Sequence, residues 1–406
     1  MKTYKGLWEQ LISEDNFREA EKKAIRGKSG QRGVRMYMKD PDGKRERLRQ
    51  QLIAGEYRTG DYVAKLVWEP KERTIYKLRF YPDRLLHHAV MNVLRPILEE
   101  KFIQNSYACQ TGKGPLAASL KCSEMVRKNR YCLQCDIRKF YPSINQAILS
   151  RQMHRIIADK RFMAVLDDII FSFPGETNIP IGNYTSQWLA NYYMTGLDNY
   201  ILHRLKPKGY IRYNDDFLLF DNDKAKLNRC REEIRDYLQR ELALEFSKVE
   251  LFDVKQGVDF CGYRHFGKYV LIRKSTANRM KRRYREIQRK MASGDYDLDR
   301  IEGQVAAGNG LMSHACSGHL RKAIRHDEIW ERVQKEKKER EQEHENAGIC
   351  GRDGAAGGGQ QQRAADPGGG GELRSGGHAE GVLHPGEHDD DPAGGAGIPR
   401  SDPGEH

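Results

Sequence analysis

The chain has 406 residues, enough for two or three domains, and its 70 Lys and Arg against 57 Asp and Glu give a net charge of +13. The last 60 residues hold 4 Arg and no Lys against 10 Asp or Glu, so residues 1–346 carry +19. Such a basic excess favours a polyanionic partner, and nucleic acid is the commonest one, although charge alone does not exclude an anionic membrane surface. No run of 18 apolar residues and no apolar signal core is present, which predicts a cytoplasmic protein without a membrane partner.

Eight cysteines are scattered along the chain, which excludes a dense disulfide scaffold and predicts reduced thiols. Cys132 and Cys135 form a C-x-x-C pair inside an apolar run, with no second Cys or His pair at zinc-site spacing. Packing in a core is therefore the favoured interpretation over a metal or redox site.

Taken in chain order, residues 1–60 predict a helical segment with basic loops, and strands and helices then alternate without a repeat. Strand patterns occur at 62–68, 74–80, 131–137, 211–220, 258–263 and 269–272. Helix patterns occur at about 84–101, 116–127, 146–173, 185–205, 224–242 and 275–325. The class is thus α+β. A charged helical extension is expected at 331–346, and the tail 347–406, with 18 Gly, is expected to be disordered.

Three carboxylates stand out because they interrupt apolar β-type sequence. Asp136 ends the run 131–137, and Asp215 and Asp216 lie between the two halves of a predicted hairpin. An isolated Asp-Asp pair is usually a polar turn and a lone Asp a strand cap, but charge in apolar surroundings is costly unless it has a task. Two Mg²⁺ ions, with Mn²⁺ able to substitute, would suit Asp136, Asp215 and the Ile137 carbonyl, while Asp216 completes the negative field.

An ordered set of motifs extends this pattern from about residue 60 to 320. It comprises E-P-K-E-R at 69–73, D-R-L-L-H-H at 83–88, S-Y-A-C at 106–109 with G-K-G at 112–114, C-D-I-R-K-F-Y-P-S-I at 135–144 and Y-N-D-D at 213–216. This set resembles reverse transcriptases, and within them the enzymes of diversity-generating retroelements. The loop I-G-N-Y-T-S-Q at 181–187 carries the finer resemblance, because retroviral and group II intron enzymes have Q-G-x-x-x-S-P there.

The resemblance implies roles for single residues. Lys71 and Arg73 match finger residues that clamp the triphosphate, although a solvated hairpin turn is the alternative. Tyr141 matches the bulky side chain that excludes a 2′-hydroxyl, where the family often has Phe, and simple packing is its alternative. Ile181, Gly182, Ser186 and Gln187 would border the nucleotide. Because Ile181 replaces an amide donor, looser nucleotide selection follows, unless Ile181 only packs in a core.

Other roles align less closely. Lys248 falls where related polymerases place a Lys that protonates the leaving pyrophosphate, and a surface Lys is the alternative. Cys261, Gly262 and Tyr263 resemble a primer-grip turn, with Tyr213 also expected at the primer or template. In a basic helix, the residues expected to follow the phosphates of a template-primer duplex are Arg282, Arg283 and Arg285.

The implied fold is a right-hand polymerase, with palm strands forming an antiparallel sheet with packed helices. Its parts would be an N-terminal helical segment at 1–60, fingers at 61–135, palm at 136–265 with finger insertions at about 145–178, and a helical thumb at 266–330. The implied function is RNA-directed DNA synthesis from a template RNA and deoxynucleoside triphosphates, error-prone at adenines, with a small basic pentameric accessory protein. A retron-type or phage-defence reverse transcriptase is the enzyme alternative, and an inactive RNA-binding protein on a polymerase scaffold is the other.

Overall fold

The structure is a computed structural model that describes residues 2–68 and 72–350. The described chain divides into two compact units, the first made of residues 2–278 and 312–317 and the second of residues 279–311 and 318–350. All three predicted carboxylates belong to the first unit. Strands and helices are mixed and every strand pair is antiparallel, which confirms the α+β class.

Four helices open the first unit, as the sequence predicts for residues 1–60. They are α1 (Leu7–Ile12), α2 (Glu14–Ile25), α3 (Arg32–Tyr37) and α4 (Pro41–Ala54). Side-chain caps start two of them, because Ser13 Oγ accepts from Asn16 N and Asp40 accepts from Gly43 N with Pro41 at the first helical position. Helix α2 packs along α5 (Leu85–Lys101), so this segment is part of the unit's core rather than an appendage.

The centre of the first unit is a four-stranded sheet with the order β4-β5-β3-β6. Its strands are β3 (Tyr131–Ile137), β4 (Gly209–Tyr213), β5 (Asp216–Asp221) and β6 (Phe246–Asp253). Alternate residues of a strand face opposite sides, so Cys132 and Cys135 enter different core clusters, each fully buried. Both thiols pack in cores, which confirms the prediction for the C-x-x-C pair.

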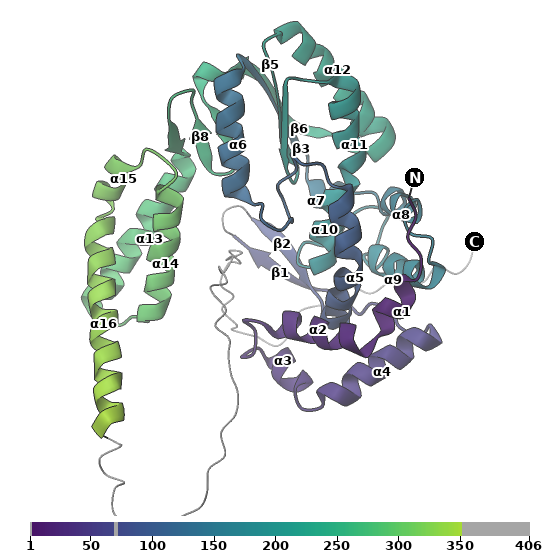
Figure 1. The fold of residues 1–406 in the computed structure, drawn as a ribbon, viewed down its shortest axis with the longest axis horizontal. Helices are drawn as coiled ribbons and strands as arrows, with labels where there is room; N and C mark the ends of the chain where they lie inside the picture. Colours follow the sequence, from purple (N-terminus) through teal and green to yellow (C-terminus); the bar gives the residue numbers. More distant parts are fainter. Residues whose placement is uncertain (1, 69–71, 351–406) are drawn as a thin grey trace, which may run out of the picture. The chain divides into compact units, whose positions relative to one another are not determined.

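Each face of this sheet is covered. Helix α6 (Pro115–Lys128) lies on one face, together with a small sheet of β7 (Val258–Phe260), β8 (Tyr263–His265) and β9 (Val270–Ile272). The other face is covered by α10 (Tyr184–Tyr193), α11 (Thr195–Tyr200) and α12 (Lys224–Leu242). Figure 1 shows α6 and α12 on opposite sides of the strands. The two faces of the sheet therefore pack against different elements.

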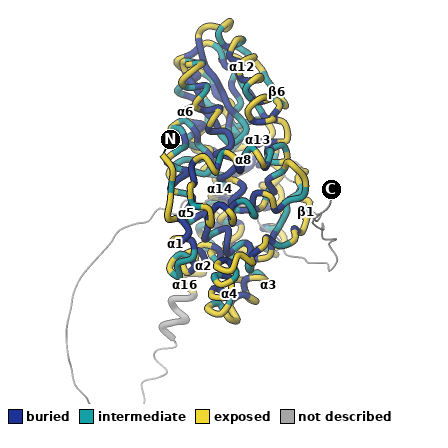
Figure 2. Tube along the Cα trace, turned by 90° about the vertical axis from the view of Figure 1, so that its right-hand side faces the viewer, coloured by how far each residue is buried: buried dark blue, intermediate teal, exposed yellow. Residues whose placement is uncertain are grey.

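The remaining elements of the first unit surround one end of the sheet. The predicted hairpin is β1 (Val63–Val67) paired with β2 (Arg73–Lys77), and its strands are exposed or half-buried (Figure 2). A π-helical turn, η1 (Phe80–Arg84), leads into α5. Three further helices follow β3, namely α7 (Phe140–Ser143), α8 (Gln146–His154) and α9 (Lys160–Ile170).

The predicted helix at 185–205 is wrong as one element, because the structure divides it into α10, α11 and the π-helical η2 (Ile201–Leu205). The break at Met194 has one tertiary and one local cause. The main-chain oxygen of Asn191 accepts from the guanidinium of Arg212 at 3.3 Å, and the next turn starts with Thr195 and Gly196, which are weak helix formers.

The second unit consists of helices. It contains α13 (Lys274–Ser293) from Arg279 onward, α14 (Leu298–Met312) up to Leu311, α15 (Gly318–Ala323) and α16 (His326–Cys350). Tyr284 OH lies 2.7 Å from Nδ1 of buried His326, and Gly308 makes room for the Tyr284 ring. Across residues 2–68 and 72–350, no helix is both long and apolar enough to span a bilayer.

Candidate active site

The register of the central sheet brings two of the predicted carboxylates together. Asp136 of β3 is paired with Asp216 of β5, and Tyr213 of β4 is paired with Asp216 in turn. Directly paired residues on antiparallel strands face the same side, so both carboxylates lie on the face that α6 and β7 cover. Asp215 stands in the β4–β5 turn, next to Asn214 in the left-handed conformation with φ of 53°. Asp136 and Asp216, which are about eighty residues apart in the sequence, thus lie on neighbouring strands.

Asp216 is under electrostatic strain. Its Oδ1 is buried without a hydrogen-bond partner. Burial raises the pKa of Asp216 to about 7, and the charges of Asp136 and Asp215 contribute to the rise, whereas Arg273 and Gln134 oppose it. A carboxylate that is desolvated beside two other carboxylates is destabilising, so an ordinary turn would not be expected to keep one there. A bound cation would relieve it.

Asp136 is held by Ser247, a residue for which the sequence predicted no role. Its Oγ donates to Asp136 Oδ2 at 2.6 Å and approaches the Asp136 main-chain oxygen at 3.3 Å. The contact exists because of a bulge in the β3–β6 pairing, where Asp136 opposes Lys248 but Ile137 opposes Phe246. Ser247 is the extra residue of this bulge. No local pattern in the sequence signals its position.

The oxygen donors of this site suit Mg²⁺ rather than a softer metal. Within residues 2–68 and 72–350, no three His, Cys, Asp or Glu side chains are arranged to enclose an ion by themselves. Mg²⁺ commonly takes only one or two carboxylates and completes its shell with water and substrate phosphates. Asp136 and Asp215, with the main-chain oxygen of Ile137, are the donors available for such an ion. The unpartnered oxygen of Asp216 fits the same chemistry.

A buried guanidinium anchors the turn that carries Asp215. Arg212 is fully buried, with Nε 2.7 Å from Asp198 Oδ1 and Nη1 2.7 Å from Asn191 Oδ1. Nη1 also donates to the main-chain oxygen of Asn214 at 3.1 Å. Arg212 therefore ties the acidic turn to α10 and α11. The sequence analysis missed it, although an Arg inside the apolar run before Y-N-D-D is a signal that could have been followed.

Tyr141 lies at the same site. Burial is the main cause that raises the pKa of the Tyr141 phenol. The charges of Cys109, Asp215 and Tyr213 raise this pKa further, whereas the Arg73 guanidinium lowers it. These groups are thus close enough to act on one another. Arg73 is exposed at the start of β2. Its predicted companion Lys71 lies outside the described residues.

The loop at 181–187 packs against the β1–β2 hairpin. The main-chain oxygen of Ile181 accepts from Tyr76 N at 2.8 Å. At Gly182, φ is 123° and an added Cβ would lie 2.6 Å from Tyr76 O, so glycine is required. Ser186 is 1% exposed, and its side chain does not reach solvent. Gln187 is exposed, with Oε1 4.0 Å from Cys109 Sγ.

The turn at 261–262 joins β7 to β8. Phe260 pairs with Tyr263 and both turn residues have positive φ, 47° at Cys261 and 87° at Gly262, the geometry of a type I′ hairpin. Burial raises the pKa of the Cys261 thiol and the charge of Asp216 adds to it, so the turn lies beside the carboxylates. Tyr263 is buried.

Lys248 has a different ion-pair partner in this structure, and the three predicted Arg residues of the basic helix lie in the second unit. Lys248 opposes Asp136 in the strand register, and its exposed Nζ pairs with Glu250 at 2.8 Å. Arg282, Arg283 and Arg285 are exposed on α13 in the second unit.

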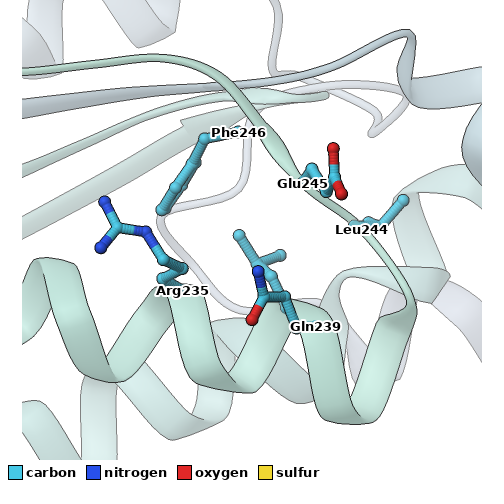
Figure 3. Close-up of a pocket in the computed structure, with 6 residues that line it drawn as sticks. Arg235, Gln239, Leu244, Glu245 and Phe246 are labelled. Carbon is cyan, nitrogen blue, oxygen red and sulfur yellow. The ribbon is translucent and has the colours of Figure 1, made fainter.

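A pocket of about 250 Å³ lies between α12 and the start of β6. Its lining includes Arg235, Gln239, Glu245 and Phe246 (Figure 3). Phe246 pairs with Ile137, which belongs to the core on the opposite face from the carboxylates. This pocket is therefore separate from the acidic site.

Comparison with known proteins gives two results. Residues 70–265 match the family described as reverse transcriptase (RNA-dependent DNA polymerase). Protein YkfC of Escherichia coli (strain K12) is 26% identical over an alignment 273 residues long, which covers 53% of this chain and 70% of that protein. The family match includes all three carboxylates, the loop at 181–187 and the turn at 261–262.

Proposed function

We propose that this chain, which carries a reverse transcriptase domain over residues 70–265, copies a retroelement template RNA into DNA by two-metal nucleotidyl transfer. The domain supports RNA-directed DNA polymerase activity in general, with an RNA template and deoxynucleoside triphosphates as substrates. The observation that carries the mechanism is the pairing of Asp136 with Asp216, beside the turn that holds Asp215. The unpartnered Asp216 oxygen supports a cation there. We also assign fingers, palm and thumb to this chain, and the family match over residues 70–265 supports this assignment.

The side chains have separate tasks in this proposal. Asp136 and Asp215, with the Ile137 carbonyl, would hold the ions, and Mg²⁺ there would supply a Lewis acid for the primer 3′-hydroxyl and positive charge for the leaving phosphates. Ser247 keeps Asp136 in one orientation, and Arg212 keeps the acidic turn in place. Lys248 reaches the leaving pyrophosphate once released from Glu250.

Substrate selection belongs to the hairpin side of the site. Arg73, with Lys71, contacts the triphosphate, and Tyr141 excludes a 2′-hydroxyl. The loop at 181–187 shapes the pocket of the templating pair through Ile181, Gly182, Ser186 and Gln187. In this proposal Gln187 contacts the pair directly, and Ser186 supports the loop by packing. The turn at 261–262 and Tyr213 hold the primer, with buried Tyr263 supporting the turn from β8, while Arg282, Arg283 and Arg285 contact the duplex phosphates.

We further propose that copying is error-prone at template adenines, as in diversity-generating retroelements. Ile181 supports this assignment because an aliphatic side chain cannot donate the hydrogen bond that an amide would. Its main chain is tied to β2 through Tyr76, so Ile181 itself is positioned without a polar contact of its side chain. A small basic accessory protein would help to hold the template RNA.

Primer extension on an RNA template with Mg²⁺ tests the polymerase proposal. Asp215→Asn should lower the rate roughly a hundredfold or more, because a positioned charge at the reacting phosphate is lost. Asp236→Asn removes an exposed carboxylate of α12 and serves as the matched control. Equal, negligible incorporation by wild type and Asp215→Asn would contradict the proposal and favour an inactive RNA-binding scaffold.

Sequencing of the cDNA tests the fidelity proposal. Errors should concentrate opposite adenine, and Ile181→Gln should reduce them, whereas Ile181→Leu, which keeps an aliphatic side chain, should not. Errors spread evenly over the four template bases would refute adenine-specific copying and favour a retron-type or defence enzyme.

A further inference from the structure

The middle of the loop at 181–187 is buried, whereas residues nearer its ends are exposed. Asn183 and Thr185 are 6% and 0% exposed. Gly182 and Gln187, in contrast, are exposed to solvent. The buried residues make side-chain contacts with segments that lie far away in the chain, and these contacts decide where the exposed residues of the loop can be.

Asn183 does not use its side chain in the way that its position predicts. It is the N-cap residue of α10, where an Asn side chain ordinarily accepts a hydrogen bond from a main-chain N–H of the first turn. Its side chain makes no such bond. Instead, Nδ2 of Asn183 donates to Tyr62 OH at 2.9 Å. The side chain therefore joins the loop to the residue that precedes β1 rather than to its own helix.

The hydrogen bond of Asn183 is the first of three that run in one direction. Tyr62 OH lies 2.7 Å from Ser172 Oγ, and Ser172 Oγ donates to the main-chain oxygen of Ile169 at 2.7 Å. Because Ser172 uses its single hydroxyl hydrogen in that bond, Tyr62 donates to Ser172 and accepts from Asn183. Tyr62 and Ser172 are buried, at 3% and 4% exposure. Loss of the Tyr62 hydroxyl would thus leave the buried amide of Asn183 without this partner.

Two adjacent histidines of α5 contact the two residues that follow Asn183. The ring of His88 stacks on that of Tyr184, with centroids 4.6 Å apart. Nδ1 of buried His87 lies 3.2 Å from Thr185 Oγ1. Three consecutive residues of the loop are therefore held by side chains from two other segments of the first unit.

We infer that Tyr62 and Asn183 are positioning residues for nucleotide selection, because their hydrogen bond holds the loop at 181–187 where it borders the incoming nucleotide. This inference rests on the proposed polymerase function. Ile181 and Gly182 have no polar side-chain atom that could hold the loop in place, so its position depends on the anchor that follows them. Loss of this anchor should weaken nucleotide binding and leave the chemistry at the carboxylates intact.

The test measures kcat and KM for addition of a single nucleotide on an RNA template by the full-length protein. The variants are Tyr62→Phe, Asn183→Ala and the two combined. Tyr37→Phe is the matched control, since Tyr37 is 1% exposed and its hydroxyl donates to Glu21 Oε2 at 2.8 Å, away from the loop. Both Tyr→Phe changes remove one buried phenol hydroxyl, so a general loss of stability is common to them.

Tyr62→Phe and Asn183→Ala should each raise the KM for the correct nucleotide roughly tenfold, because a buried polar group loses its partner in the first and the loop loses its anchor in the second. The kcat of both should stay within about twofold of wild type, since only binding is affected uniformly. The double variant should have a KM no higher than that of the weaker-binding single variant, because both changes remove the same hydrogen bond. Tyr37→Phe should keep the wild-type KM.

An unchanged KM in the single variants, an equal rise in Tyr37→Phe, or effects that multiply in the double variant would overturn the inference. Asn183→Ala alone decides the question if Tyr62→Phe does not fold. Absence of extension by wild type would instead refute the polymerase proposal, and with it the inference that rests on it.

Discussion

Replacing Asp216 should stabilise the fold while it removes activity. In the metal-free protein, burial and the charges of Asp136 and Asp215 raise the pKa of Asp216 from 3.8 to about 7. The folded state therefore binds a proton that the unfolded state has released between about pH 4 and pH 7, so wild-type stability falls as pH rises through this window. At 1.36 kcal/mol for each pKa unit, the loss by pH 8 is on the order of 2–4 kcal/mol.

The measurement is urea unfolding of wild type and Asp216→Asn at pH 5 and pH 8 in a metal chelator. Wild type should be less stable at pH 8 than at pH 5, whereas the variant should change little and exceed wild type at pH 8. Added Mg²⁺ should stabilise wild type more than the variant, because a cation neutralises the crowded carboxylates. A variant no more stable than wild type at pH 8 would refute the account of strain at Asp216.

Three further predictions concern the supports of the site. Ser247→Ala should raise the Mg²⁺ concentration for half-maximal extension roughly fivefold, because one hydrogen bond to a charged carboxylate is lost. Ser247→Thr, which keeps the hydroxyl, should restore the wild-type value. An unchanged Mg²⁺ requirement in Ser247→Ala would contradict the role of Ser247 in holding Asp136. Arg212→Met should lower the free energy of unfolding by about 3–5 kcal/mol, because Asp198 stays buried without its partner, and adding Asp198→Leu should recover part of this loss. Gly182→Ala should strain the loop by about 1–3 kcal/mol and raise the KM for nucleotides, and an unaltered KM would show that the loop does not border them.

Local patterns in the sequence were sufficient for most elements. The apolar run at residues 131–137 identified β3, and helix patterns in the sequence identified α5 and α12 to within a residue or two. The two helices can be recognised in the sequence because each repeats the 3.6-residue spacing of apolar residues over its length. The division of the predicted helix at 185–205 has no such pattern in the sequence. It depends on the Arg212 guanidinium of β4, which donates to the main-chain oxygen of Asn191 in α10.

By itself the sequence predicted the type of chemistry, because three acids inside apolar β-type segments have few other uses. Only the tertiary structure decided their arrangement. The pairing of Asp136 with Asp216, the bulge that brings Ser247 to Asp136 and the burial of Arg212 beneath the turn all depend on strand register between segments far apart in the chain. Register is decided by the packing of whole faces, and a shift of one residue would reverse every side chain, so no local pattern contains it.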